Sequence, residues 1–213
     1  PRSHPFPAGA KPLELLWVQE FIDPYAEARR NGTKVLLQPD VRWGRCDIKS
    51  VNLLANVLAR QQVKQAQVFE AILVNEGLVT EGAVSNVMVV QGGTVVTAPQ
   101  GSRILSGITR AVVLDLARSE GLPVQERFIT QADLYEADEV FLTGTTVEVL
   151  AVIRVDGKII GDGRPGLIAQ RLAHALLPLQ PEQLARRAVQ VVDPPFQVRD
   201  DDAFVDRVKN GFE

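Results

Sequence analysis

Lys49 and Glu81 are the two residues whose types and positions point most directly to chemistry. Lys49 lies in Arg45-Cys46-Asp47-Ile48-Lys49-Ser50, where a strand-like run gives way to a helix-like one. A lysine amine captures a carbonyl carbon when burial or a neighbouring cation favours its neutral form. Glu81, in the turn Thr80-Glu81-Gly82, is a candidate electrostatic partner for a ring nitrogen. Taken alone, each residue also has an ordinary interpretation, as a surface lysine and as a turn glutamate.

Two turns rich in hydroxyl groups are candidates for holding a phosphate: Ser106-Gly107-Ile108-Thr109 and Thr143-Gly144-Thr145-Thr146. The first directly precedes a predicted helix, so its free N–H groups would lie at the positive end of the helix dipole. The second follows a predicted strand and would approach the same phosphate from another side. A threonine N-cap and a β-turn are the ordinary alternatives. Together with Lys49 and Glu81, these turns supply the parts that an enzyme using pyridoxal 5′-phosphate (PLP) needs.

Arg2 and His4, in Pro1-Arg2-Ser3-His4, are candidates for binding a substrate carboxylate. An arginine fork donates two parallel hydrogen bonds to a carboxylate, and a nearby histidine adds a third donor. An irregular tail is the alternative interpretation of this terminal segment.

Other chemistries have weaker signals in this sequence. Gly161-Asp162-Gly163-Arg164-Pro165-Gly166 matches the Gly-x-Gly-x-x-Gly pattern, but its strand belongs to a predicted hairpin and no strand follows to close a βαβ unit. We therefore interpret it as a loop. One cysteine and two histidines are too few for a structural zinc site, so no metal is predicted.

Composition limits the function classes further. The 213 residues are 46% hydrophobic, which is enough for one large domain with a buried core. A net charge of −3 gives no electrostatic footprint for nucleic acid. No apolar run approaches the ~20 residues of a membrane-spanning helix, and the single cysteine favours a reducing cytoplasm. Because the chain begins at Pro1 without a methionine, we expect it to be part of a longer gene product.

Strands and helices mix without strict alternation, which predicts an α+β (mixed α/β) domain and not a doubly wound sheet. Apolar periodicity and turn residues predict three long helices and two short ones. The first long helix follows Ser50, which is its predicted N-cap. The other two long helices span Thr109–Ser119 and Gly166–Leu177. The short helices lie within Asp23–Gly32 and at Gln131–Ala137. Strands are predicted at Glu14–Phe21, Lys34–Leu37, Val68–Val74, Leu78–Thr80, Asn86–Val90, Thr94–Ala98, Val124–Ile129, Glu139–Leu142, Val149–Val155 and Lys158–Ile160.

At this point the residues converge on a family. The stretch Val41–Leu54 closely resembles the lysine segment of D-amino-acid aminotransferases, which are fold-type IV PLP enzymes. That fold type also includes branched-chain aminotransferases and aminodeoxychorismate lyase. The resemblance runs from Pro1 to about Leu177 and continues, in order, through Phe69–Leu73, Thr80–Gly82, Ser85–Val87, Gly107–Arg110 and Thr143–Thr146.

The resemblance implies specific roles. Lys49 would form the Schiff base with PLP and carry protons at the substrate's Cα, and Glu81 would partner the pyridine nitrogen. The resemblance also implies donors to the phosphate, namely Ile108, Thr109, Gly144 and Thr145. Arg2 and His4 would bind the substrate α-carboxylate, in this family from the neighbouring subunit of a homodimer. The implied reaction is ping-pong transamination between a D-amino acid and a 2-oxo acid.

The resemblance also implies a domain organisation. Residues 1–12 form an interdomain loop, residues 13–177 form the large C-terminal PLP-binding domain, and residues 178–213 form an extension of unknown role. The resemblance further implies that the family's small N-terminal domain is not part of this chain. Gly144 stands where a serine is common, and Ala83-Val84 replace hydroxyl residues, so we expect hydrogen bonding at the phosphate and at Glu81 to differ. The alternatives are lyase chemistry of the aminodeoxychorismate type, a branched-chain or amine aminotransferase, and a truncated fragment without activity.

Overall fold

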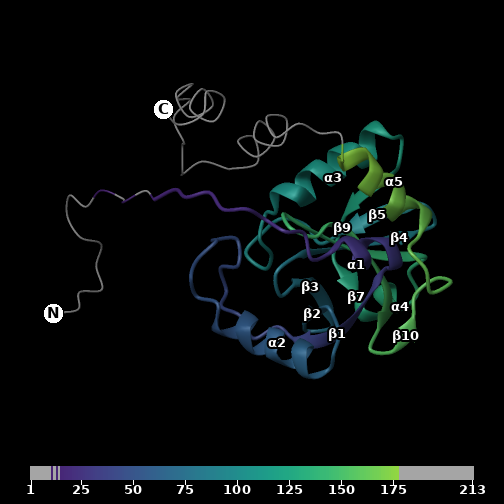
Figure 1. The fold of residues 1–213 in the computed structure, drawn as a ribbon. Coiled ribbons are helices and arrows are strands. Elements are labelled where there is room, and N and C mark those ends of the chain that lie inside the picture. Colours follow the sequence, from purple (N-terminus) through teal and green to yellow (C-terminus); the bar gives the residue numbers. More distant parts are fainter. Residues whose placement is uncertain (1–10, 12, 14, 178–213) are drawn as a thin grey trace, which may run out of the picture.

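A curved, mixed sheet of ten strands forms the centre of the protein in the computed structural model, which describes residues 11, 13 and 15–177 (Figure 1). Its strand order is β6-β5-β4-β8-β9-β1-β2-β3-β7, with β10 paired to β9. The strands are β1 (Thr33–Pro39), β2 (Glu70–Asn75), β3 (Leu78–Gly82), β4 (Asn86–Gln91), β5 (Thr94–Thr97), β6 (Val124–Glu126), β7 (Ile129–Thr130), β8 (Glu139–Gly144), β9 (Glu148–Val155) and β10 (Lys158–Ile159).

Both parallel and antiparallel pairs occur in this sheet. β1 lies parallel to β2 and to β9, and β5 lies parallel to β6. The remaining pairs of the described sheet are antiparallel. Tight two-residue loops join β2 to β3, β4 to β5 and β9 to β10, as the turn residues predict. At the last loop Asp156 and Gly157 both have positive φ, 49° and 80°, which matches the twist of the flanking strands. The mixed α/β prediction is confirmed.

Alternate residues along the strands divide the core into an inner and an outer part. Leu142 and Leu150 face an inner cluster that the sheet curves around, whereas Phe141 and Val149 face outward. The helices α3 (Ile108–Ser119) and α5 (Leu167–Leu176) cover this outward face of β4, β8 and β9. The apolar side of the sheet is thereby buried.

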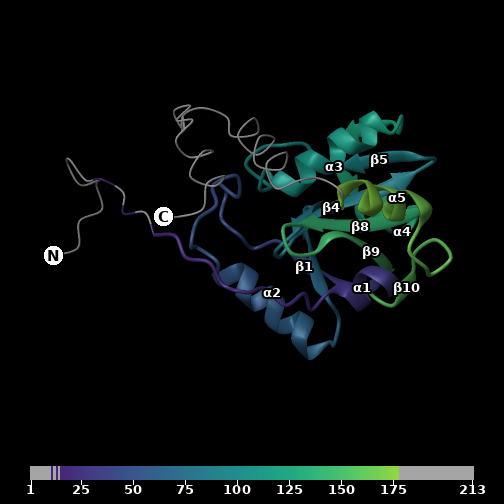
Figure 2. The same ribbon diagram turned by 45° about the horizontal axis from the view of Figure 1, so that its top comes forward.

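Three further helices complete the described fold. α2 (Leu54–Gln65) covers β1 and β2 through Ala59 and Val63, at the opposite end of the molecule from α3 and α5 (Figures 1 and 2). α1 (Ala26–Asn31) packs beside β9, and α4 (Gln131–Tyr135) contributes Leu134 to the inner cluster. None of the helices in the described part of the chain has the length and apolar character that a membrane crossing requires.

Two predicted strands differ from the structure. Residues 15–21 form no strand: they are irregular, and Leu15, Trp17 and Val18 are at least 71% exposed, because the described chain offers no neighbouring strand to accept their hydrogen bonds. The predicted strand Val124–Ile129 is split, with β6 pairing to β5 and β7 to β3. Residues 178–213 and the loop 1–10 lie outside the described residues.

The start of α2 also differs from the prediction. Ser50 is not its N-cap, because the helix begins at Leu54 and Leu53 occupies the cap position without a side-chain bond. The Ser50 hydroxyl instead accepts a hydrogen bond from the Asn52 N–H at 3.2 Å.

Candidate active site

Glu81 lies near the end of β3 in a buried position where three donors converge on its carboxylate. Oε2 accepts hydrogen bonds from Asn86 Nδ2 at 2.9 Å and from the Leu105 N–H at 3.0 Å, and Oε1 pairs with the guanidinium of Arg42. The residue is 4% exposed. Burial raises the pKa of Glu81, and the positive charge of Arg42 opposes that rise. The predicted turn glutamate is therefore a buried, firmly held acid.

Asn86 connects this acid to the start of α3. Its Nδ2 donates to Glu81 and also to the Leu105 carbonyl at 2.9 Å. A Cβ on Gly107 would overlap its Oδ1, so Gly107 lets the helix start pack directly on Asn86. Asn86 is also the partner of Thr143 in the β4–β8 ladder. The acid, the helix start and the threonine-rich turn consequently meet at one end of the sheet.

The N-terminus of α3 offers free donors at this meeting point. The helix begins at Ile108, one residue before the prediction, and its N-cap Gly107 makes no side-chain cap. The N–H groups of Ile108, Thr109 and Arg110 have no hydrogen-bond partner among the described residues. Twelve aligned peptide units make this end partially positive, so an anion is favoured here. The threonine N-cap alternative is wrong, since Thr109 lies inside the first turn.

The threonine-rich turn lies beside the same helix start. Thr143 and Gly144 are the last residues of β8, so the connection to β9 is shorter than predicted and contains Thr145 and Thr146, both exposed. The Thr143 hydroxyl is buried and has no partner within the described chain. Gly144 is half-buried, and a Cβ on it would touch Val147. The pairing of Thr143 with Asn86, which packs on Gly107, places this turn near the free N–H groups.

Lys49 is exposed, and it makes no side-chain hydrogen bond or ion pair with any described residue. The loop that carries it lies against the segment that contains Leu105, because the Cys46 N–H donates to the Ser102 carbonyl at 2.8 Å. The structure therefore brings the lysine loop alongside the segment that covers Glu81. It does not bring the amine into contact with the acid.

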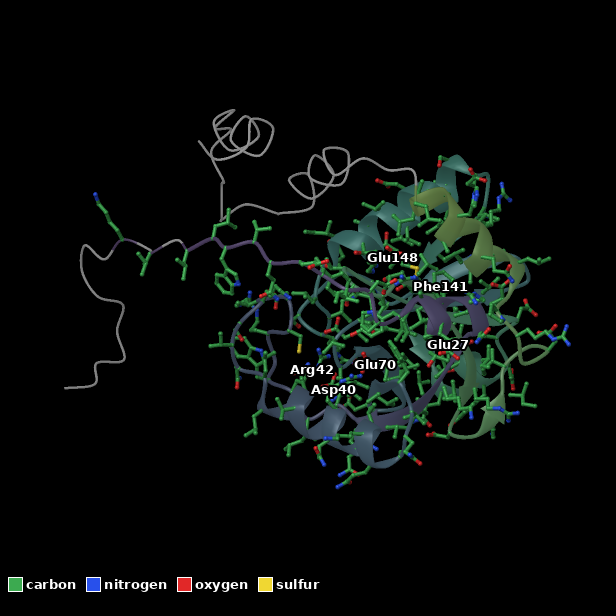
Figure 3. The ribbon with its side chains drawn as sticks, in the orientation of Figure 1. Glu27, Asp40, Arg42, Glu70, Phe141 and Glu148 are labelled. Carbon is green, nitrogen blue, oxygen red and sulfur yellow. The ribbon has the colours of Figure 1, made fainter. Side chains whose placement is uncertain are left out.

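Arg42 and Asp40 belong to the site although the sequence did not single them out. Arg42 Nη2 donates to Asp40 Oδ2 at 2.7 Å and to the Arg103 carbonyl at 3.1 Å, and its side chain is 8% exposed. Figure 3 shows Asp40 and Arg42 beside each other on the α2 side of the molecule. Burial acts to raise the pKa of Asp40, but hydrogen bonds from Arg42 and Thr80 outweigh it and the pKa is lowered. Burial acts to lower the pKa of Arg42, but its bonds to Asp40 and Glu81 raise it further above its already high ordinary value.

The turn between Glu81 and Asn86 is held from behind by α2. Asn56 Nδ2 donates to the Ala83 carbonyl at 2.7 Å. Glu70, labelled in Figure 3, is completely buried beneath this turn, where its carboxylate accepts from the Ala71 N–H at 2.9 Å and lies 3.5 Å from Ser85 Oγ. Burial raises the pKa of Glu70. The helix that follows Lys49 thus helps to fix the acidic turn.

Two other sequence motifs have different outcomes. Arg2 and His4 lie outside the described residues. The Gly161–Gly166 loop precedes α5, but the carboxylate of Glu139 already accepts the N–H groups of Ile168 and Ala169, at 2.9 and 2.8 Å. A hollow of about 720 Å³ beside this loop is lined by none of the described residues that were predicted to bind PLP. The start of α5 is therefore not available to a phosphate. This agrees with the interpretation of Gly161–Gly166 as a loop and not as a dinucleotide site.

Comparison with known protein families gives one match over most of the chain. A family model described as amino-transferase class IV matches residues 8–155. A D-alanine aminotransferase of Bacillus licheniformis is 44% identical over 176 residues, which are 83% of this chain and 62% of that protein. A D-alanine aminotransferase of Staphylococcus haemolyticus is 39% identical over 173 residues, 81% of this chain and 61% of that protein. The chain thus spans about three fifths of the length of these relatives.

Solved structures also match. A branched-chain amino acid aminotransferase of Escherichia coli aligns with a TM-score of 0.65 and 32% identity, over 72% of this chain and 53% of that one. A branched-chain amino acid aminotransferase of T.th., complexed with N-(5′-phosphopyridoxyl)-L-glutamate, aligns with a TM-score of 0.66 and 33% identity, over 75% of this chain and 56% of that one.

Proposed function

The chain belongs to the class IV amino-transferase family, and from this premise we propose that it takes part in PLP-dependent transfer of an amino group between a D-amino acid and a 2-oxo acid. The preference for D-amino acids is supported by the relatives named D-alanine aminotransferase, at 39–44% identity. The branched-chain aminotransferases among the solved structures are 30–34% identical. They define the competing substrate class.

The residues at the site fit PLP. A ring nitrogen that carries a proton needs a buried, ionisable acceptor, which Glu81 provides. A phosphate needs several donors, and the free N–H groups of Ile108 and Thr109 supply them together with the hydroxyls of Thr109 and Thr145. Gly144 lets the backbone of the threonine-rich turn lie close to Val147 and Ser85. When bound, PLP provides an electron sink for the substrate's α-carbon.

Lys49 is the residue that we assign to covalent attachment and proton transfer. Its Nζ makes no bond to any described side chain, so no described residue competes with a cofactor for the amine. With PLP held at this site, the same amine would remove the proton from the substrate's Cα. Asn56 and the rest of α2 hold the turn behind Glu81, so the loop that carries Lys49 and the acid share one support.

A second copy of the chain completes this proposal. Arg2 and His4 would bind the substrate carboxylate across the interface of a homodimer. The start of α2 supports an interface, because Leu54, Val57 and Leu58 lie on one helix face and are 56–69% exposed. We expect Val57→Glu to change the sedimentation coefficient of the protein from that of a dimer to that of a monomer. Lys64→Glu, at an exposed residue of the same helix, is the control and should leave the dimer intact. A cytoplasmic location stays a prediction from the single cysteine.

The observation that carries the proposal is the convergence, around Asn86, of a buried acid and an uncapped helix N-terminus. The test is to mix the intact protein with PLP, D-alanine and 2-oxoglutarate and to measure pyruvate, with L-leucine as the competing donor. We expect pyruvate from D-alanine, none with Lys49→Ala, and unchanged production with Lys64→Ala, an exposed lysine of α2. Bound PLP without transfer from any amino acid would refute the proposal. Faster transfer from L-leucine would move it to the branched-chain class.

A further inference from the structure

Glu81 is bound in a way that leaves one defined place for a ligand. A carboxylate has about four lone-pair sites, two on each oxygen. Asn86 and the Leu105 N–H use both sites of Oε2, and Arg42 uses one site of Oε1. A single acceptor site therefore remains, on the oxygen that Arg42 holds. One N–H donor fits this site.

Arg42 is itself held from the side away from Glu81. Asp40 accepts from both its Nε, at 2.9 Å, and its Nη2, at 2.7 Å, in a bidentate pair. The Thr80 hydroxyl donates to Asp40 at 2.7 Å, and the Arg103 carbonyl accepts from Arg42 at 3.1 Å. With its guanidinium fixed at both ends, Arg42 has no freedom to move away from Oε1.

The charges of this cluster favour a cationic donor. Asp40, Arg42 and Glu81 are each at most 8% exposed at the side chain, and with both carboxylates ionised they carry one net negative charge. Asp40 balances the arginine, so the charge of Glu81 is left for the ligand. Without Arg42, burial and the nearby charge of Asp40 would both drive Glu81 to take up a proton. An ionised Glu81 accepts a hydrogen bond from a protonated ring nitrogen. A protonated Glu81 would instead donate a hydrogen bond to an unprotonated ring nitrogen.

We propose that Arg42, anchored by Asp40, is a positioning residue that keeps Glu81 ionised and directs its one free acceptor site to the protonated ring nitrogen of PLP. The inference rests on the proposed function and extends it to two residues that act through Glu81. Arg42 thereby determines whether the proton of the hydrogen bond between Glu81 and the ring nitrogen lies on the nitrogen or on the carboxylate. The strength of the ring as an electron sink depends on that position.

The experiment is nitrogen NMR of the intact protein loaded with PLP that carries ¹⁵N in the ring, since the ring resonance separates protonated from unprotonated nitrogen. The wild type is expected at the protonated position and Glu81→Gln at the unprotonated one. Arg42→Met should shift the resonance toward the Glu81→Gln position. Arg42→Lys should shift it less, because a point charge remains without the fork. Arg45→Met is the matched control, because Arg45 is an exposed arginine of the same loop that pairs with Asp47.

The outcomes are distinguishable. A wild-type resonance position in Arg42→Met overturns the inference while the proposed function stands. An equal shift in Arg45→Met also overturns it, since loss of any nearby arginine would then suffice. If Arg42→Met does not fold, Arg42→Lys is the test. A smaller shift of its ring resonance toward the Glu81→Gln position supports the inference, and the wild-type position overturns it. A wild-type protein that binds no PLP refutes the proposed function and this inference with it.

Discussion

Replacing Gly107 with alanine tests whether Asn86 joins Glu81 to the start of α3. Gly107 has φ −68° and ψ 132°, which alanine adopts without strain, so the effect is purely steric. The new Cβ would overlap Asn86 Oδ1, and Asn86 is 5% exposed with both bonds of its Nδ2 committed. Asn86 has to turn, and its hydrogen bond to Glu81 is the contact that breaks.

The structure sets the size of this effect. Loss of a hydrogen bond to a charged acceptor costs about 1.5–3 kcal/mol, and alanine restricts the unfolded chain by about 0.4–1 kcal/mol in the opposite direction. We expect Gly107→Ala to lower the free energy of unfolding by about 0.5–2.5 kcal/mol in urea titrations. Its affinity for PLP, measured by fluorescence titration, should fall as well, because Glu81 and the phosphate donors lose their common support.

Two further glycines provide controls for Gly107→Ala. Gly166 is the N-cap of α5 in a similar backbone conformation, and a Cβ there would overlap Glu139. Gly166→Ala should lose comparable stability and keep the wild-type PLP affinity. Gly44 has nothing within 4 Å of the new Cβ, so Gly44→Ala should change stability by less than about 1 kcal/mol. Equal PLP affinity in Gly107→Ala and Gly166→Ala would refute the reasoning.

Three further outcomes are expected. Lys49→Ala should change the free energy of unfolding by less than about 0.5 kcal/mol, because the side chain is exposed and unpartnered among the described residues. A larger change in urea titrations would show that the amine makes a packed contact. Arg110→Ala should cost about 2–3 kcal/mol, since this buried guanidinium donates to the Ala98 carbonyl and to Glu126, and urea titration measures the loss. Burial raises the pKa of Glu70 above its unfolded value, so ionised Glu70 opposes folding at pH 7 and this penalty disappears as the pH falls through the raised pKa. The stability of the wild type relative to Glu70→Gln should therefore rise as the pH falls from 7 toward the ordinary pKa of 4.5. A constant difference in urea titrations would contradict this sign.

Local sequence patterns predicted most of the secondary structure correctly because the signals are short-range. The pair Asp156-Gly157 fits a two-residue hairpin, and its positive φ angles were observed. The apolar period of Thr109–Ser119 gave α3 to within one residue. Residues 15–21 show the limit of such signals. Their apolar residues favour a strand, but a strand forms only where a neighbour accepts its hydrogen bonds, and the described chain supplies none.

The sequence by itself determined the residue types of the site: an acid in a turn before a strand, a helix that starts with glycine, and a lysine ahead of another helix. Only the tertiary structure decided how that acid is held. Arg42 reaches Glu81 from 39 positions away, and the donor from Leu105 is a backbone N–H, which no side-chain pattern reveals. The pairing of β4 with β8 brings Asn86 opposite Thr143. These contacts depend on strand order and on the curvature of the sheet, which join segments that local patterns treat as independent.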